Sequence, residues 1–417
     1  MAEKFSSRVT FIAACAGSAV GLGNLFRFPL LCLRYGACFL PVYLLLLVVL
    51  GFPLLYFELL LGRRWGGAAP KAFGALGKAG KPVGGLCCGV SFIVLCCYGL
   101  LFSFVLASSV FSLALFFPDG ADSARIFASN VAPDRFTLPA LFFLAVGWIF
   151  ILLCFGSAKK LGAVSLVCLC LSAALLLCLA VFAAVSHPEA LLFLLRPDLS
   201  PLLTLKFWAD TAGQVFFSLS LATGVMVTYG SFLDSRENLL SSTLWIVVFD
   251  LAFSLAGTVI YLAFAERGAE PTIFSCFAVY PTAFATLGRL GGLLSLLFFI
   301  SLAFLCLDSA VAYLKAVTSC LSHKISAKEP LRALIFALPA FVFGLFILSL
   351  GLLPYFDGRV IPLFSLLAGS LEALTFSYGA RGGKHSPLPL KGGFFTLSAR
   401  FTLPLFTLFL FFCEIFY

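Results

Sequence analysis

The stretch GSAVGLGNLFRFP, residues 17–29, interrupts an apolar run near the N-terminus of the chain. It contains glycines, an asparagine, an arginine and a proline, residues that break helices or resist burial in hydrocarbon. Irregular backbone at membrane depth is tolerated only where it lines a protein cavity. Either this segment does not cross a membrane, or its irregular backbone is the functional part of the chain.

The composition indicates an all-α polytopic membrane protein. Of the 417 residues, 62% are hydrophobic and 11% are charged, whereas about 25% of the residues in a soluble domain are charged. We therefore expect a single membrane domain over residues 1–417. Runs long enough to cross ~30 Å of hydrocarbon predict eleven spans. They cover residues 9–33, 37–61, 86–117, 138–156, 161–185, 208–232, 241–265, 290–320, 332–353, 360–379 and 393–416.

The basic residues predict the orientation of these spans. Lysines and arginines gather in the segments on the N-terminal side of the membrane, such as Arg63, Arg64 and Lys71. This bias predicts a multi-pass protein of the cell (inner) membrane with a cytoplasmic N-terminus, and an odd span count places the C-terminus outside. The net charge of +9 is thus a topology signal and does not indicate nucleic-acid binding.

The fifteen cysteines do not predict a disulfide framework. Nearly all lie inside predicted spans, where cysteine acts as a small apolar residue. The three histidines do not neighbour a cysteine cluster. We therefore expect neither a disulfide nor a cysteine–histidine metal site.

Only the first and sixth predicted spans are strongly interrupted. The sixth contains GQVFFSLSLATGVMVTYGSF, residues 213–232. Five spans separate the two interruptions, so the two copies cross the bilayer in opposite directions, which is the sequence pointer to an inverted repeat. The predicted repeats cover 9–185 (helices 1–5) and 208–379 (helices 6–10), and 393–416 forms an additional eleventh helix.

The interruptions predict a site for a cation and an anionic group. Carbonyls freed by unwinding are ligands for a small hard cation, and the N-terminal ends of half-helices attract an anion. A second interpretation stays open, because Gly17 and Gly21 would also permit close helix packing.

Four motifs resemble those of the neurotransmitter:sodium symporter family. GSAVGLGNLFRFP resembles its first-helix signature and GQVFFSLSLATG (213–224) its sixth-helix signature. GFPLLYFELLLGR (51–63) resembles its second span, and LDS (307–309) its eighth-helix sodium motif. The similarity runs in matching order from about residue 5 to 380. It implies the LeuT-like fold with discontinuous helices 1 and 6, and no organic cofactor.

The resemblance implies two Na⁺ sites. The first would use Ala19, Asn24, Ser218 and Asp250 together with the substrate carboxylate. The second would use the carbonyls of Gly17, Val20 and Leu305 and the side chains of Asp308 and Ser309. The residues point the same way, because an acid inside a span costs ~2.5–3.5 kcal/mol and is a functional hypothesis by default. A salt bridge from Lys315 to Asp308 is the alternative.

The resemblance also has implications for chloride. Asp250 stands where chloride-dependent relatives have asparagine, while their neighbouring serine is present as Ser254. A fixed carboxylate supplies the charge that chloride would bring. We therefore expect chloride-independent transport, with Asp250 as a candidate to carry a proton on the return step.

The resemblance implies an amino-acid substrate. Relatives that carry amines have an aspartate where this chain has Gly21, so the ligand would bring its own carboxylate. The site would consist of Ala19, Gly21, Leu22, Gly23, Val94, Tyr98, Phe217, Ser218, Ser220, Thr223 and Tyr313. Such a pocket is apolar with a few hydroxyls and suits a neutral hydrophobic or aromatic amino acid, because a charged one would be buried unpaired. Tyr98 as a packing residue is the alternative.

The resemblance implies an outer gate but not a complete inner gate. Arg27 and Asp357 would close the outer side above Phe217 as an ion pair or through water, although Asp357 alone also fits a solvated loop acid. Glu58 and Glu372 would brace the unwound sixth helix, with one of them protonated. The inner salt bridge of relatives is missing, because Phe5, Lys4 and His323 occupy the corresponding positions.

Sodium-coupled uptake by alternating access is the expected function. A membrane-embedded enzyme is one alternative, but the acids are scattered singly and form no nucleophile–base pair. A non-transporting amino-acid sensor of the same fold is the other. The expected partners are the amino acid and the lipid bilayer, and not nucleic acid; a monomer and a weak dimer both stay open.

Overall fold

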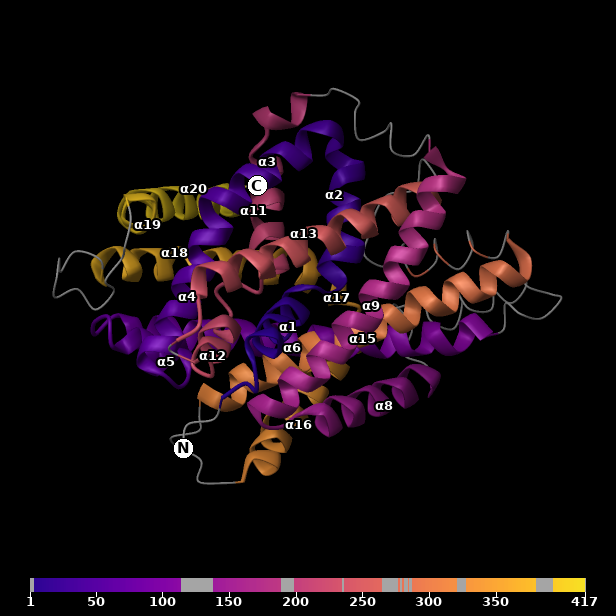
Figure 1. Ribbon diagram of the computed structural model, residues 1–417, viewed down its shortest axis with the longest axis horizontal. Helices are drawn as coiled ribbons and strands as arrows, with labels where there is room; N and C mark the ends of the chain where they lie inside the picture. Colours follow the sequence, from indigo (N-terminus) through magenta and orange to yellow (C-terminus); the bar gives the residue numbers. More distant parts are fainter. Residues whose placement is uncertain are drawn as a thin grey trace.

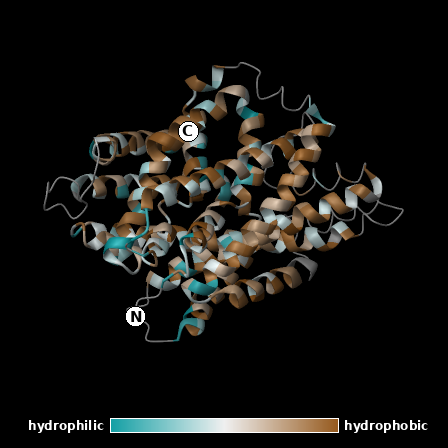
Figure 2. Cartoon of the chain, in the orientation of Figure 1, coloured by the Kyte–Doolittle hydropathy of each residue, from teal (hydrophilic) through white to brown (hydrophobic). Residues whose placement is uncertain are grey.

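The computed structural model describes residues 4–113, 138–188, 199–234, 236–264, 277, 280, 284, 287–320, 328–379 and 393–416. In these residues the regular secondary structure is entirely helical (Figure 1). Hydrophobic residues cover most of the helices, and hydrophilic ones are few (Figure 2). Both features confirm the predicted all-α membrane fold.

Eight helical runs in the described residues are long and apolar enough to cross a membrane. They are Gly23–Trp65, Gly80–Val110, Ala158–Ser186, Leu239–Phe264, Leu290–Cys320, Glu329–Ser349, Leu353–Tyr378 and Gly393–Phe416, and Arg8–Ala19 and Leu141–Cys154 are shorter apolar helices. The difference from eleven arises at three places. One is the predicted span 138–156, which the described residues show as the shorter helix Leu141–Cys154. The predicted spans 9–33 and 37–61 are divided at 20–22 and then run on helically to Trp65, and the predicted span 208–232 is divided into two short helices.

The first interruption lies where the sequence predicts it. Helix α1 (Arg8–Ala19) ends with Val20 in an extended conformation, and the chain resumes as a π-helical turn, η1 (Gly23–Arg27), that leads into α2 (Phe28–Tyr35). The 3-10 turn η2 (Gly36–Cys38) then reverses the chain into α3 (Phe39–Leu46), η3 (Leu47–Gly51) and α4 (Phe52–Trp65).

The second interruption separates α11 (Leu205–Ser218) from α12 (Val225–Gly230). Between them Ser220 and Ala222 adopt φ of 51° and 57°, and Gly224 adopts 73°. Positive φ is uncommon for residues other than glycine and costs energy. The interruption is therefore a backbone feature that its surroundings must hold in place.

The remaining helices surround these two broken ones. Helices α6 (Gly80–Phe111) and α15 (Gly288–Cys320) pack along each other and contact α5 (Ala69–Gly74), α8 (Leu138–Cys154), α9 (Ala158–Ser186) and α16 (Glu329–Ser349). Helix α13 (Leu239–Phe264) packs on α1, α2, α9 and η1. Helices α18 (Ile361–Gly379) and α20 (Leu403–Phe416) pack together beside α11 (yellow, Figure 1). The short elements are η6 (Ser200–Leu203), α17 (Leu353–Tyr355), η7 (Phe356–Val360), α19 (Gly393–Leu397) and η9 (Ser398–Thr402).

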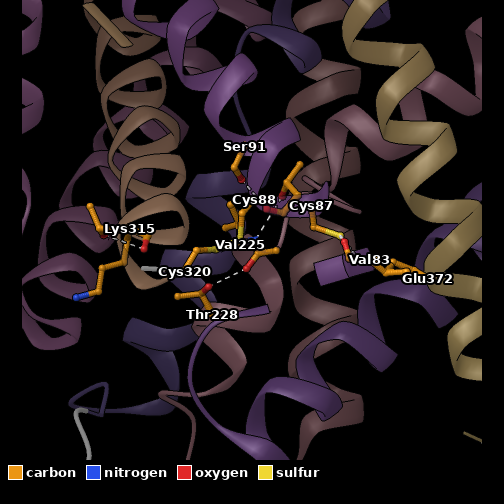
Figure 3. The surroundings of a disulfide bond; sticks show 12 residues. Val83, Cys87, Cys88, Ser91, Val225, Thr228, Lys315, Cys320 and Glu372 are labelled. Atoms are coloured by element: carbon orange, nitrogen blue, oxygen red, sulfur yellow. Dashed lines mark hydrogen bonds between the residues drawn. A yellow bond between two sulfur atoms is a disulfide. The ribbon is translucent and has the colours of Figure 1, made fainter. Parts of the chain in front are cut away.

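One expectation about the cysteines is wrong. Cys88 of α6 and Cys320 of α15 form a disulfide with a Cα–Cα distance of 6.7 Å, whereas the neighbouring Cys87 points away toward Glu372 (Figure 3). The two bonded cysteines are 232 residues apart in the chain. Their contact follows from the packing of α6 against α15, about which residue spacing carries no information.

Candidate functional site

The two interruptions face each other and are joined by hydrogen bonds. The Ser220 hydroxyl donates to the Ser18 carbonyl at 2.8 Å, and the Gln214 side chain donates to the Gly23 carbonyl at 3.1 Å. A Cβ on Gly23 would lie 2.6 Å from the Phe217 ring, so the close approach of the two chains requires glycine at that position. Two unwound segments, linked at positions that are 202 and 191 residues apart in the chain, thus form one polar centre among buried helices.

A buried acid marks one edge of this centre. Asp250 of α13 has no exposed surface; its Oδ1 accepts hydrogen bonds from Asn24 Nδ2 at 2.7 Å and from the Ser218 hydroxyl at 2.5 Å. Asn24 Nδ2 also donates to the Ser254 hydroxyl at 2.8 Å. The structure therefore brings the predicted first-site side chains together, and Ser254 lies beside them. Asp250 oxygen Oδ2 accepts a hydrogen bond from Tyr43 at 3.3 Å.

Tyr43 is a site residue that the sequence reasoning missed. It lies on α3, inside a long apolar run, and nothing in the residue pattern distinguishes it from tyrosines that only pack. Its side chain has no exposed surface. Only the packing of α3 shows that its hydroxyl reaches Asp250.

The donor set around Asp250 fits a small hard cation. Within the described residues Asp250 has no lysine or arginine partner, and a buried carboxylate is stable only with a proton or a compensating cation. Hydroxyl, carboxylate and amide oxygens are the ligands that such a cation takes. The Asn24 amide oxygen accepts from the Gly21 N–H at 3.0 Å, while its amide nitrogen faces the acid. For Asn24 to bind a cation beside Asp250, its side-chain amide must therefore flip so that the oxygen faces the acid.

A second buried acid lies at the end of α1. Asp308 of α15 accepts a hydrogen bond from the Ser165 hydroxyl of α9 at 2.5 Å, and its other oxygen, Oδ2, is buried without a hydrogen-bond partner. The Ser309 hydroxyl lies 3.3 Å from the Gly17 carbonyl and 3.5 Å from the Val20 carbonyl. The predicted second-site residues thus lie together, with Leu305 one turn earlier on α15.

The unpartnered oxygen of Asp308 fits a cation at this place. An unpaired buried carboxylate oxygen is costly, and the two nearby carbonyls would complete a set of oxygen ligands. The alternative for Asp308 is wrong, because Lys315 forms its ion pair with Glu329 of α16. Ser165 was not predicted, since a serine within an apolar span carries no distinguishing signal.

Aromatic side chains close the centre on the α6 and α15 sides. A Cβ on Gly21 would lie 2.8 Å from the Tyr98 hydroxyl, so this hydroxyl lies directly against the first interruption. The Tyr98 ring centre lies 6.1 Å from that of Phe217 and 5.5 Å from that of Tyr313. The Tyr313 hydroxyl is 3.1 Å from that of Ser220.

The other predicted pocket residues lie close by in the chain. Val94 precedes Tyr98 by one turn of α6 and is buried. Leu22 lies between the two glycines of the first interruption and has no exposed surface. The Thr223 hydroxyl donates to the Ser220 carbonyl at 2.6 Å, within the second interruption.

The predicted outer gate is assembled without a direct ion pair. The Arg27 guanidinium lies 5.7 Å from the centre of the Phe217 ring, and its Nη1 is buried without a hydrogen-bond partner. Asp357 lies on η7 within electrostatic range of Arg27. Both are described residues, and no ion pair joins them in this structure.

Glu58 contacts the second interruption directly. Its Oε1 accepts the backbone N–H of Ala222 at 2.9 Å, at a residue with positive φ. The neighbouring acid Glu372 accepts a hydrogen bond from the Cys87 thiol at 3.0 Å and does not contact the unwound backbone by a hydrogen bond in the described part of the chain. Of the inner-gate positions, His323 lies outside the described residues, and Lys4 pairs with Asp234 at 2.7 Å.

Comparison with known proteins gives the same picture. The profile of the Sodium:neurotransmitter symporter family matches residues 2–122 and 128–367. An uncharacterized sodium-dependent transporter of Methanocaldococcus jannaschii is 26% identical over 396 residues, which cover 88% of this chain and 80% of the relative. The uncharacterized sodium-dependent transporter YhdH of Bacillus subtilis is 30% identical over 329 residues, covering 76% and 72%.

A solved structure matches over almost the full length. The crystal structure of MhsT in complex with L-phenylalanine superposes with a TM-score of 0.86 at 26% identity and covers 99% of each chain. The matched family and relatives are transporters, which confirms a transporter and excludes the membrane-embedded enzyme. With two broken helices, buried acids at both interruptions and a family profile that spans most of its length, the chain belongs to the sodium:neurotransmitter symporter family.

Proposed function

We propose that this chain takes up a neutral, hydrophobic or aromatic L-amino acid together with Na⁺ by alternating access. The observation that carries the proposal is the pair of buried acids, Asp250 and Asp308, one at each edge of the paired interruptions and neither with a basic partner in the described residues. Asp250 is surrounded by hydroxyls and the Asn24 amide, and hydroxyls and backbone carbonyls lie beside Asp308. Both sets contain oxygen ligands suited to Na⁺. Two cations would thus enter with each amino acid.

The substrate would bind between the two acids. Its carboxylate would lie against the backbone at Gly21 and the Tyr98 hydroxyl, which are in contact range of each other. Its side chain would lie among Phe217, Tyr313 and Ser220, where the described pocket residues carry no charge. MhsT was crystallised with L-phenylalanine, and that supports, by similarity, an aromatic or other apolar amino acid.

We propose that chloride is not required. The Asp250 carboxylate sits among the hydroxyls of Tyr43, Ser218 and Ser254 and supplies a fixed negative charge next to the first cation. A proton taken up by Asp250 after Na⁺ leaves would compensate that charge on the return step.

The proposed orientation follows the basic residues, with the N-terminus in the cytoplasm of the inner membrane. Lys4, Arg8 and Arg63 would then lie on the cytoplasmic side. The predicted repeats 9–185 and 208–379 would be the two halves that carry the interruptions.

Uptake into proteoliposomes tests the proposal. Radiolabelled phenylalanine, leucine, glutamate and arginine would be compared with an inward Na⁺ gradient and with K⁺ in its place. We expect phenylalanine and leucine to accumulate with the inward Na⁺ gradient and not with K⁺ in its place. Accumulation that is equal in Na⁺ and K⁺ contradicts sodium coupling, uptake of glutamate or arginine contradicts the substrate class, and Na⁺-dependent binding without uptake favours the sensor.

A further inference from the structure

A series of contacts connects the segment before α1 to the buried residue Lys315. Phe5 donates its backbone N–H to the Phe232 carbonyl at 3.2 Å, and the two rings lie 6.0 Å apart. The Phe232 ring centre lies 5.4 Å from the Lys315 ammonium. Lys315 in turn pairs with Glu329. This chain of contacts connects the segment before α1, the segment after α12, and helices α15 and α16.

Lys315 lies between the second candidate sodium site and the end of the molecule. It follows Asp308 by seven residues on α15, which is about 10 Å along a helix. A cavity of about 250 Å³ lies on the other side, and its lining includes Phe232, Lys315 and Glu329. The contact between the Phe232 ring and the Lys315 ammonium therefore lies between this cavity and the second candidate sodium site.

The contacts of Lys315 fall into two groups. Its ammonium donates to the Gly156 carbonyl at 3.1 Å, pairs with Glu329 and lies 5.6 Å from the Phe155 ring centre. Phe155 and Gly156 lie in the connection between α8 and α9, and Glu329 is the first residue of α16. Among the contacts named here, that with Phe232 involves the segment that carries an interruption, because Phe232 lies two residues after the end of α12.

We propose that the Phe232–Lys315 contact is the cytoplasmic gate of this chain and that Glu329 is the residue that positions Lys315. The proposal rests on the proposed function, which places this end of the molecule in the cytoplasm. When the broken helices move away from α15, Phe232 leaves Lys315. The ammonium keeps Glu329, the Gly156 carbonyl and Phe155, so opening does not leave a buried charge unpaired.

The neighbouring ion pair is a weaker candidate for this role. The side chains of Lys4 and Asp234 are 49% and 45% exposed, and pairs of this kind contribute little because water screens them. The Lys315 side chain is 4% exposed, and a cation over a ring is attracted more strongly when the cation is withdrawn from water.

Hydrogen–deuterium exchange of the full chain in lipid nanodiscs tests the gate. The probe is Na⁺ without substrate, and the readout is the exchange of the amides of α1 and α12. The matched pair is Phe232→Leu and Phe155→Leu, since both remove a ring that faces the same ammonium. We expect Phe232→Leu to raise the exchange by about three- to tenfold, the effect of losing one partly buried cation–π contact, and Phe155→Leu to leave it within about twofold.

The lysine and its partner are tested in the same assay. Lys315→Gln should raise the exchange as Phe232→Leu does, and Lys315→Arg should retain the wild-type value because the cation is kept. Glu329→Gln should also raise it, and the double variant with Lys315→Gln should add nothing further, since the two residues act as one unit. If Lys315→Gln fails to fold, the phenylalanine pair decides alone.

Several outcomes would overturn the gate. They are an equal effect of the two phenylalanine variants, wild-type exchange in Phe232→Leu, and a larger effect of Lys4→Gln than of Lys315→Gln. Failure of the proposed function is seen separately. In that case the exchange of the wild-type chain would be the same in Na⁺ and in K⁺, whatever the variants show.

Discussion

Asp308 and Gly17 are in such close contact that any larger residue at position 17 would displace the acid. A Cβ on Gly17 would overlap the carboxylate oxygen Oδ2 of Asp308, the oxygen that is buried without a hydrogen-bond partner. The contact brings the acid of α15 to the end of α1, where helical carbonyls become free. Gly17 is therefore required for the geometry of the second candidate sodium site, and not only for helix packing.

Substitution of Gly17 tests this relationship. We expect Gly17→Ala to weaken the apparent affinity for Na⁺ by about tenfold or more, because the acid must move away from the carbonyls. Na⁺ titration of substrate binding by scintillation proximity measures it. Gly89→Ala on α6 is the control, since its added Cβ meets no atom within 4 Å. Equal Na⁺ affinities of the two variants would contradict the site.

The charge of Asp250 predicts the anion dependence. Uptake by the wild-type chain should be the same in chloride and in gluconate. Asp250→Asn should lose about tenfold or more of its uptake in gluconate, since a neutral side chain leaves the buried cation uncompensated, and should recover part of it in chloride. Proteoliposome uptake in the two salts decides it, and loss of wild-type uptake in gluconate would show that chloride is needed.

The two tyrosines of the pocket should differ in their effects. Tyr98→Phe removes the hydroxyl next to Gly21 and should weaken amino-acid affinity by about tenfold or more, the value of a hydrogen bond to a charged group. Tyr313→Phe removes a hydroxyl that contacts Ser220 and should have a smaller effect. Isothermal titration calorimetry in Na⁺ measures both. A larger loss in Tyr313→Phe would place the carboxylate elsewhere.

The ion pair of Lys4 and Asp234 should be insensitive to physiological pH. The hydrogen bond from Lys4 lowers the pKa of Asp234, so the carboxylate stays ionised above its unfolded pKa of about 3.9. Its contribution is complete above that pH and is lost as the pH falls through the lower folded-state value. Asp234→Asn should shift the thermal midpoint by the same small amount at pH 5 and pH 8. A shift that changes between these two values would count against this assignment.

The fold was predictable to the extent that it depends on local properties. Apolar runs of sufficient length predicted the spans, and the helix-breaking residues of 17–29 and 213–232 predicted both interruptions, which the structure confirms. The count of separate spans was less accurate. Short turns such as η2 join helices without a polar segment between them, so hydropathy alone gives no boundary there.

The candidate site was predictable for residues that are unusual in a membrane. Asp250, Asp308 and Asn24 are polar groups that hydrocarbon would exclude, so their presence alone indicated a role. Tyr43 and Ser165 gave no such signal, because both are ordinary residues of apolar helices. Their hydrogen bonds to the two acids became visible only with the helices in place.

By itself the sequence determined that the chain crosses a membrane, where its helices break and which acids are buried, because each of these depends on the cost of placing a given residue in hydrocarbon. The tertiary structure alone decided the partners: Lys315 with Glu329 and not with Asp308, and Cys88 with Cys320. Partners are chosen by the packing of helices that are far apart in the chain, and no local preference of a residue encodes that packing.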